Sequence, residues 1–234
     1  MCHSVRFISL GPGDPDLITI KALRVLQQAD IIFYPSTISK SGRAVSRALD
    51  ILNQLEISAG KLYPFAVPMN KNRSLAIESY NNISANIEEK YKNGQETAVV
   101  AEGDAGFYSS IHYIYDYLAE RKIPVEHIAG IPAFIACGAL AGIHTVKQEE
   151  ELIVIPGTAT GEALSEYLQS GKTIIVMKVS QCQDTIKLII RQQPRHTYHY
   201  FENAGVAGTE YYTSNQNDIL NRSIPYFSLM IIKP

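Results

Sequence analysis

Two short turns, each rich in glycine and acidic residues, constrain the fold and chemistry of this chain more than any other feature. The first is GPGDP at 11–15, and it follows an apolar, strand-like run at 5–10. The second is EGDAG at 102–106, and it follows a similar run at 97–101. In open parallel sheets, ligands bind beyond the carboxyl ends of the strands. We therefore predict that both turns lie at one edge of a sheet and form a ligand site there.

The composition of these turns narrows the class of ligand. The first turn has a proline between its glycines and no third glycine, so it lacks the dinucleotide fingerprint, and it also lacks the Gly-Lys-Ser/Thr ending of a P-loop. Acidic turns repel phosphate but suit a cationic or hydroxyl-bearing ligand, so a sulfonium nucleoside fits better than ATP or NAD. Taken alone, the first turn is equally well explained as a plain strand-to-helix connection.

Strand-like runs alternate with amphipathic helical segments along the chain, which predicts two α/β domains with mixed, largely parallel sheets. We expect strands at 5–10, 30–34, 97–101, 152–155, 173–178, 196–201 and 226–232. We expect helices at 19–28, 42–57, 71–92, 108–120, 132–141, 161–169 and 181–192. Charged residues and a proline at 121–124 end a helix, so we place the domains at 1–122 and 123–234.

Charge and hydropathy exclude several kinds of partner. The 234 residues carry a net charge of −2, with 21 basic and 23 acidic side chains and no basic run, which argues against nucleic acid. The longest apolar runs, at 173–177 and 227–232, are far shorter than the roughly 20 residues that cross a bilayer. The N-terminal residues lack the pattern of a signal peptide. We therefore expect a soluble, cytoplasmic enzyme.

Cysteine and histidine spacing gives no metal site. The three cysteines, Cys2, Cys137 and Cys182, are far apart and predict neither a disulfide framework nor a CxxC pair. Among the six histidines only His196 and His199 are close in sequence, which is too few for a metal site. There is no Gly-x-Ser-x-Gly elbow, so hydrolase chemistry is not supported.

Several motifs resemble those of the tetrapyrrole methylase family, whose members use S-adenosylmethionine. These motifs are LGPGDPDLIT at 10–19, YPS at 34–36, EGDAGFYSS at 102–110, GIPA at 130–133, MK at 177–178, ENA at 202–204 and the strand at 225–232. The resemblance covers nearly the whole chain and implies the family's fold, with an active-site trough between two domains. YPS, and EGD followed by FYSS and Tyr113, most resemble the precorrin-2 carbon-20 methyltransferases of cobalamin (vitamin B12) synthesis.

The resemblance implies a set of cofactor contacts, most of them made by the backbone. They fall on Pro12, Glu102, Gly103, Asp104, Phe107, Pro132, Ala133, Met177 and Ala204. Two segments depart from the family pattern: the usual GDP triplet reads GDA at 103–105, and the usual PGI-Thr/Ser segment reads AGIP at 129–132. The family further implies S-adenosylhomocysteine as product, a homodimer and no protein-bound metal, since any cobalt would arrive inside the substrate.

Methyl transfer from a sulfonium is an in-line displacement in which the cofactor supplies an activated methyl group, so the protein mainly positions the reactants. If a side chain assists, Tyr108, Ser109 and His112 are best placed, because they follow the second turn. Helix packing explains Tyr108 equally well. The carboxylates of a tetrapyrrole call for cations, and the candidates are Lys40, Arg43, Arg73 and Lys178. For each cation alone, a solvated surface charge is the simpler interpretation.

Two alternatives stay open on the sequence alone. The chain could be a family member that methylates another corrinoid carbon or a diphthamide precursor. It could also be a catalytically silent protein that keeps the fold and binds the cofactor, an alternative that Ala105 and Pro132 keep open because they depart from the family pattern.

Overall fold

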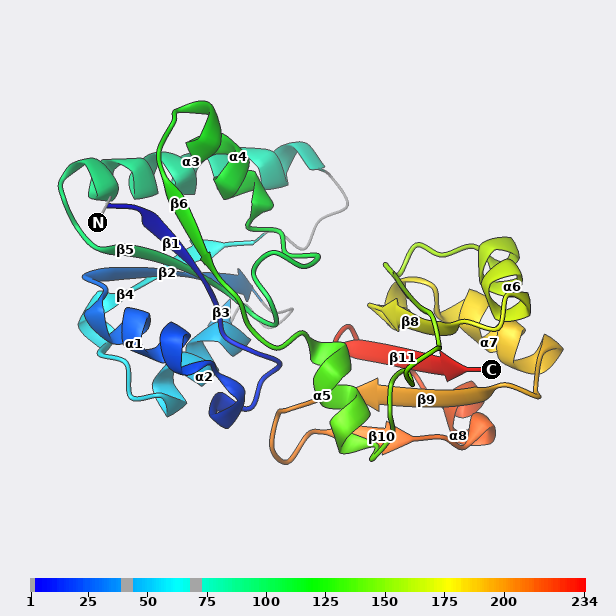
Figure 1. Cartoon of the computed structure of the whole chain (residues 1–234). Coiled ribbons are helices and arrows are strands. Elements are labelled where there is room, and N and C mark those ends of the chain that lie inside the picture. Colours follow the sequence, from blue (N-terminus) through cyan, green and yellow to red (C-terminus); the bar gives the residue numbers. More distant parts are fainter. Residues whose placement is uncertain (1–2, 39–43, 68–72) are drawn as a thin grey trace. The chain divides into compact units, whose positions relative to one another are not determined.

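The computed structural model describes residues 3–38, 44–67 and 73–234, and it divides into two compact units (Figure 1). Unit 1 is Met1–Pro132 and unit 2 is Ala133–Pro234. The division falls ten residues later than the predicted boundary after Lys122. The reason is β6 (Val125–Ile128), which pairs in parallel with β1 (Val5–Ser9) and so belongs to unit 1.

Unit 1 is a parallel sheet with helices on both faces (Figure 1). Its other strands are β2 (Ile31–Ile38), β3 (Ala44–Val45), β4 (Leu62–Ala66) and β5 (Thr97–Ala101). The order is β4-β2-β5-β1-β6, and the short β3 pairs antiparallel with the end of β2. Its helices are α1 (Ile20–Gln28), α2 (Arg47–Gln54), α3 (Arg73–Lys92) and α4 (His112–Glu120), with short 3-10 turns η1 (Pro15–Leu17) and η2 (Ala59–Lys61).

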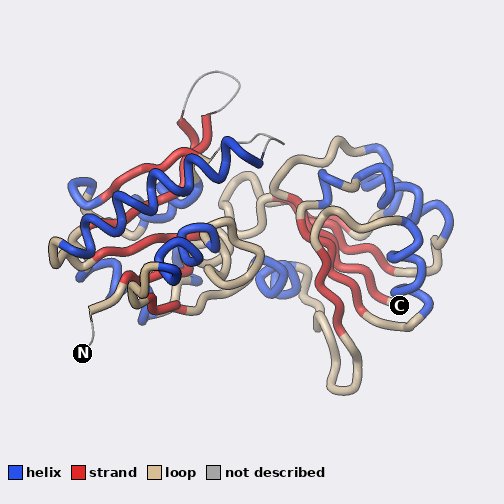
Figure 2. Tube along the Cα trace, turned by 90° about the horizontal axis from the view of Figure 1, so that it is seen from above, coloured by secondary structure: helices blue, strands red, loops and turns tan. Residues whose placement is uncertain are grey.

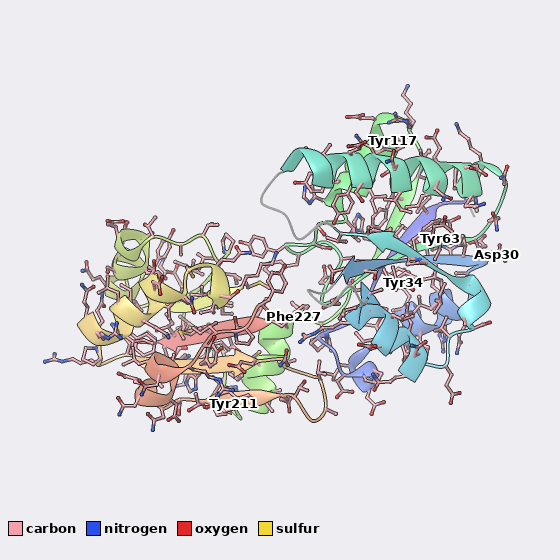
Figure 3. The ribbon with its side chains drawn as sticks, turned by 180° about the vertical axis from the view of Figure 1, so that it is seen from behind. Asp30, Tyr34, Tyr63, Tyr117, Tyr211 and Phe227 are labelled. Carbon is pink, nitrogen blue, oxygen red and sulfur yellow. The ribbon has the colours of Figure 1, made fainter. Side chains whose placement is uncertain are left out.

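Alternation of buried side chains along the strands gives unit 1 two cores. Phe7, Phe33 and Val99 point to the face covered by α3 and α4. Their neighbours in sequence point to the other face, where α1 and α2 pack. Tyr34 of the YPS motif belongs to this second core, with 8% of its surface exposed (Figure 3). Both faces of the sheet are therefore covered, and the strand ends are left for a ligand.

Unit 2 is a mixed five-stranded sheet. Its strands are β7 (Leu152–Ile155), β8 (Thr173–Met177), β9 (Thr197–Glu202), β10 (Tyr211–Thr213) and β11 (Ser228–Lys233), in the order β10-β9-β11-β8-β7. Its helices are α5 (Ala133–Leu140), α6 (Gly161–Gln169), α7 (Gln183–Gln192) and α8 (Gln216–Asn221), with η3 (Val179–Gln181) after β8. Figures 1 and 2 show α5 on the face of the sheet opposite α6 and α7.

The predicted class, two α/β domains with mixed and largely parallel sheets, is confirmed. Strands β3, β4, β6 and β10 and helix α8 are missed by the sequence pattern, because they are short or contain proline. The helix expected at 42–57 begins only at Arg47, since Ser46 caps its first turn and residues 44–45 form β3. The helix expected at 108–120 begins at His112, because Tyr108 has a φ of +49° that a helix does not allow.

A partly buried ion pair lies at the end of β9 in unit 2. Arg222 donates hydrogen bonds from Nε and Nη2 to the Glu202 carboxylate, with 3.0 Å from Nη2 to Oε2, and the Tyr200 hydroxyl donates to Oε1 at 2.8 Å. The Arg222 guanidinium also lies over the ring of Tyr211, 3.7 Å from its centroid. Burial opposes ionisation of Glu202, but the hydrogen bonds from Arg222 and Tyr200 outweigh it and hold the pKa of Glu202 below its ordinary value.

We predict that Arg222→Gln destabilises the protein by about 2 kcal/mol at pH 7. A fully buried pair that loses one partner costs about 3–5 kcal/mol, and the partial exposure of Arg222 reduces that figure. A carboxylate whose pKa is lowered on folding stabilises the fold above its unfolded pKa, and this contribution is lost as pH falls through the folded pKa. The difference in urea unfolding between variant and wild type should therefore shrink in acid. Arg195→Gln, at an exposed position, is the control, and equal effects of the two variants would contradict the prediction.

Candidate active site

The two glycine-acid turns meet at one edge of the unit 1 sheet, as predicted. β1 and β5 are adjacent and parallel, and their chains stay paired beyond the strands. The Leu10 amide donates to the Ala101 carbonyl at 2.8 Å. Gly11 and Gly103 then exchange two backbone hydrogen bonds, of 3.1 and 2.7 Å, across an isolated bridge. Because this pairing uses backbone groups alone, the two turns form one continuous surface at the carboxyl ends of the strands.

Asp104 ties a third loop to this surface. Its Oδ1 accepts a hydrogen bond from the Gly106 amide at 2.9 Å, and its Oδ2 accepts one from the Gly130 amide at 2.8 Å. Gly130 follows β6, on the other side of β1. Both carboxylate oxygens of Asp104 are thus engaged by backbone amides, so its side chain positions the turns.

Ser9, the last residue of β1, connects the second turn to the end of β6 through its hydroxyl group. Its hydroxyl accepts a hydrogen bond from the Ala105 amide at 2.8 Å and donates one to the Ile128 carbonyl at 2.7 Å. Ser9 is fully buried. The sequence interpretation missed this residue, although a polar residue in an apolar strand just before a glycine turn is a readable signal for a buried hydrogen bond.

Gly130 is required by a close approach of the chain to Ser9. A Cβ at position 130 would lie 2.4 Å from Ser9 Cβ and 3.0 Å from the Gly103 carbonyl oxygen. Gly103 has the opposite surroundings, because its φ is +69° and nothing lies within 4 Å of its Cβ position. Gly130 therefore lets its loop pack closely against Ser9, while Gly103 leaves open space beside the second turn for a ligand.

The remaining acids of the turns differ in their surroundings. Asp14 caps the short η1 turn, where its Oδ1 accepts from the Asp16 amide at 2.9 Å. Glu102 follows β5 directly, and burial raises its pKa, while the positive charge of Arg47 acts against this rise. Burial also lowers the pKa of Arg47. The sequence interpretation missed Arg47, although Ser46 before an amphipathic run is a readable helix cap.

The candidate catalytic residues lie between the second turn and the first residue of α4, which is His112. The Tyr108 side chain is 47% exposed, and its ring packs edge-on against Phe107 with 4.8 Å between the centroids. A φ of +49° is strained for a tyrosine, and such strain is concentrated at functional sites. His112 lies within 3.0 Å of the Ser109 carbonyl through Nδ1 and packs on the ring of Tyr113. Catalytic roles for Tyr108, Ser109 and His112 stay predictions.

In unit 2, two of the three predicted cofactor residues lie at or just after strand ends. Met177 ends β8, and the loop with Ala204 follows β9; both strands pair with the start of β11. The Asn203 amide donates to the Phe227 carbonyl at 3.0 Å, and Phe227 is labelled at this end of the sheet in Figure 3. Met177 and Ala204 therefore lie at the same edge of the unit 2 sheet. Ala133 lies elsewhere in this unit, at the first position of α5.

Backbone geometry marks this edge of unit 2 as well. Lys178 and Asn203, the residues next to Met177 and Ala204, both have positive φ, at +56° and +49°. A Cβ at Gly157, after β7, would lie 2.3 Å from the Lys178 carbonyl oxygen. Close backbone approach and strained non-glycine residues are features of ligand turns.

Little of the predicted substrate cluster can be placed. Lys40 and Arg43 lie outside the described residues, and Arg73 begins α3 with its side chain outside the described part. Lys178 is half-buried after β8. Within residues 3–38, 44–67 and 73–234, no group of three or more His, Cys, Asp and Glu side chains is arranged to hold a metal ion. Over the same residues, every helix is too short or too polar to cross a membrane.

The chain belongs to the tetrapyrrole (corrin/porphyrin) methylases, because the sequence profile of this family matches residues 4–219. It is therefore a C-methyltransferase that takes its methyl group from S-adenosylmethionine. A precorrin-2 C(20)-methyltransferase of Sinorhizobium sp is 28% identical to it over 229 residues, which are 96% of this chain and 93% of the relative. A probable cobalt-precorrin-2 C(20)-methyltransferase of Methanocaldococcus jannaschii is 31% identical over 182 residues, which are 78% and 75% of the two chains.

A solved structure has the same fold. The uroporphyrin-III C-methyltransferase of Thermus thermophilus, complexed with S-adenosylhomocysteine, aligns with a TM-score of 0.68 at 16% sequence identity. The alignment covers 98% of this chain and 97% of the other. The expected family and the fold that it implies are thus confirmed.

We predict that Gly130→Ala disrupts the surface at the ends of β1, β5 and β6. The added methyl group would collide with Ser9 Cβ, and overpacking of this kind typically costs about 1–3 kcal/mol. Thermal unfolding should show a lower midpoint, and the affinity for S-adenosylhomocysteine should fall. Gly60→Ala is the control, because its Cβ would meet nothing nearer than 3.9 Å. A wild-type midpoint for Gly130→Ala would contradict the prediction.

Proposed function

We propose that this chain transfers a methyl group from S-adenosylmethionine to carbon 20 of precorrin-2 or cobalt-precorrin-2, giving precorrin-3 or its cobalt form in cobalamin biosynthesis. The observation that carries the proposal is its similarity, over 96% of its length, to a relative named for this reaction. The YPS and FYSS segments support the same choice within the family.

The proposed cofactor contacts divide between the two units. In unit 1 they are Pro12, Glu102, Gly103, Asp104, Phe107 and Pro132. The Asp104 carboxylate also holds the turns in place. In unit 2 they are Ala133, Met177 and Ala204. The empty space at the Cβ position of Gly103 supports contact through the backbone, because a ligand can approach that turn without meeting a side chain.

For methyl transfer, the protein mainly has to orient the methyl donor and the acceptor carbon. Carbon 20 attacks the methyl carbon as the bond from that carbon to sulfur breaks, so the sulfonium becomes a neutral thioether. A proton then leaves carbon 20. Holding the two reactants in line supplies much of the acceleration, and hydrogen bonds from the Ala105 and Gly130 amides position the strand-end turns for this role.

We further propose that the enzyme works in the cytoplasm as a homodimer. Lys40, Arg43, Arg73 and Lys178 are the proposed partners of the substrate carboxylates, and Tyr108, Ser109 and His112 the proposed assisting side chains. The exposed ring of Tyr108 supports a substrate contact, since aromatic faces bind flat conjugated rings well.

We predict micromolar binding of S-adenosylhomocysteine that Asp104→Ala weakens more than Tyr108→Phe does. Removing the Asp104 carboxylate leaves the Gly106 and Gly130 amides without their acceptor, which loosens two loops of the site. Isothermal titration calorimetry measures the affinities. Asp116→Ala, at an exposed position on α4, is the control. The reverse order of the two effects would show that Asp104 does not position the cofactor turn.

We also predict that the enzyme adds one methyl group to precorrin-2 or cobalt-precorrin-2, at carbon 20. Mass spectrometry detects the added methyl, and NMR with isotope-labelled cofactor locates it. Label at another carbon would reject the assignment within the family. Binding of S-adenosylhomocysteine without methylation of either substrate would favour a silent cofactor-binding protein. Assaying both substrates also decides whether cobalt is present before this step.

A further inference from the structure

The strained backbone of Tyr108 lies between two hydrogen-bonded anchors. Its φ of +49° is sparsely populated by tyrosine, and such a conformation persists only where the surrounding structure fixes it. Two residues before it, the Gly106 amide donates a hydrogen bond to Asp104 Oδ1 at 2.9 Å. Two residues after it, Ser110 Oγ accepts a hydrogen bond from the Tyr80 hydroxyl at 2.6 Å. The second anchor comes from α3, 30 positions away in the chain.

Tyr80 is a rigid hydrogen-bond donor. Its side chain belongs to the core between the sheet and helices α3 and α4, and the residue is only 2% exposed. The ring packs against Phe65 of β4, with 6.2 Å between the centroids, and against Tyr113 of α4, at 5.1 Å. Because close packing on two sides fixes the ring, it also fixes the place of the hydroxyl.

The segment that receives this hydrogen bond is held less firmly by its own backbone. The amides of His112 and Tyr113 donate to the carbonyls of Ser109 and Ser110 at 3.4 Å each, which is long for such bonds. Ser110 itself is exposed, so water can take the place of the Tyr80 hydroxyl if that group is lost. The hydrogen bond therefore adds little to the stability of the fold, but it determines where the segment lies.

We propose that Tyr80 is a positioning residue that acts through Ser110 to hold the Tyr108 ring ready for the methyl acceptor. The proposal rests on the proposed function, in which the 47% exposed ring of Tyr108 contacts the tetrapyrrole. A ring that is already in place loses less freedom on binding, which strengthens the affinity for the acceptor. Other hydrogen bonds, made by Ser9 and Asp104, fix the turns proposed for the cofactor, so Tyr80 acts on acceptor binding.

The kinetic test uses Tyr80→Phe, which keeps the packed ring and removes the hydroxyl. The KM for the tetrapyrrole should rise about fivefold, a ratio typical of one net hydrogen bond. The kcat should change by less than about twofold, because the lost contact stabilises the bound substrate and the transition state alike. The Kd for S-adenosylhomocysteine and the thermal midpoint should stay at their wild-type values. Ser110→Ala should reproduce the rise in KM, and the double variant should be no worse than either single one.

Tyr117→Phe is the matched control. Tyr117, labelled in Figure 3, also joins α4 to α3 through its hydroxyl, which donates to Glu88 Oε2 at 3.2 Å. This bond lies away from the second turn, so its loss should leave the KM for the tetrapyrrole unchanged. Equal changes in KM for Tyr80→Phe and Tyr117→Phe would overturn the proposal, because they would show a general loosening of the helices.

A second measurement does not depend on the identity of the acceptor. The chain contains no tryptophan, so Tyr108→Trp places a single fluorophore at the strained position. In this background, Tyr80→Phe should lower the fluorescence anisotropy of the introduced tryptophan, because the segment moves more freely. Tyr117→Phe should leave the anisotropy unchanged. An anisotropy that Tyr80→Phe does not alter would reject the role of Tyr80.

The outcomes separate the two proposals. Wild-type protein that methylates neither precorrin-2 nor cobalt-precorrin-2 would reject the proposed function, and the tryptophan measurement would still decide whether Tyr80 holds the segment. Wild-type protein that methylates one of them, together with an unchanged KM in Tyr80→Phe, would reject the role of Tyr80 alone. If Tyr80→Phe does not fold by circular dichroism, Ser110→Ala carries both measurements, since Ser110 is exposed.

Discussion

The pairing of Gly11 with Gly103 is the interaction on which the candidate site of unit 1 depends. It extends the contact between β1 and β5 past the end of the sheet and turns two separate loops into one surface. Asp104 then attaches the loop after β6 to that surface, and the Ser9 hydroxyl joins the second turn to the last residue of β6. A site built in this way needs no large side chains of its own, since its shape is set by backbone groups that the sheet holds in register.

Unit 2 positions its strand ends by different means. Its sheet is mixed, so the start of β11 lies between the ends of β8 and β9 and supports both of their loops. The partly buried pair of Glu202 and Arg222 fixes the last residue of β9, directly before the loop that contains Ala204. The two units thus hold predicted cofactor residues in comparable places with unrelated contacts, a backbone bridge in one and an ion pair in the other.

The sequence predicted the features that depend on local pattern. Apolar runs ending in glycine located β1 and β5, and the adjacency of their turns followed from the general geometry of parallel sheets. Short elements such as β4 and β10 were missed because a few residues with a proline or a single turn give no periodicity. The roles of Ser9 and Gly130 depend on contacts between segments far apart in the chain. No local signal reports how close those segments come, so the sequence predicted a ligand contact at Asp104 but not that the Asp104 carboxylate also joins two loops.

The span of these contacts has a consequence for folding. Ser9 and Ala105 are 96 positions apart, and Ser9 and Ile128 are 119 positions apart. The surface therefore has no local nucleus, and it is completed only after the strand at the start of the chain has been enclosed by strands made much later. A small molecule bound there would hold these distant segments together and act as a cross-link on the native state of the whole unit, so its concentration in the cell would help to set how much of the protein is folded.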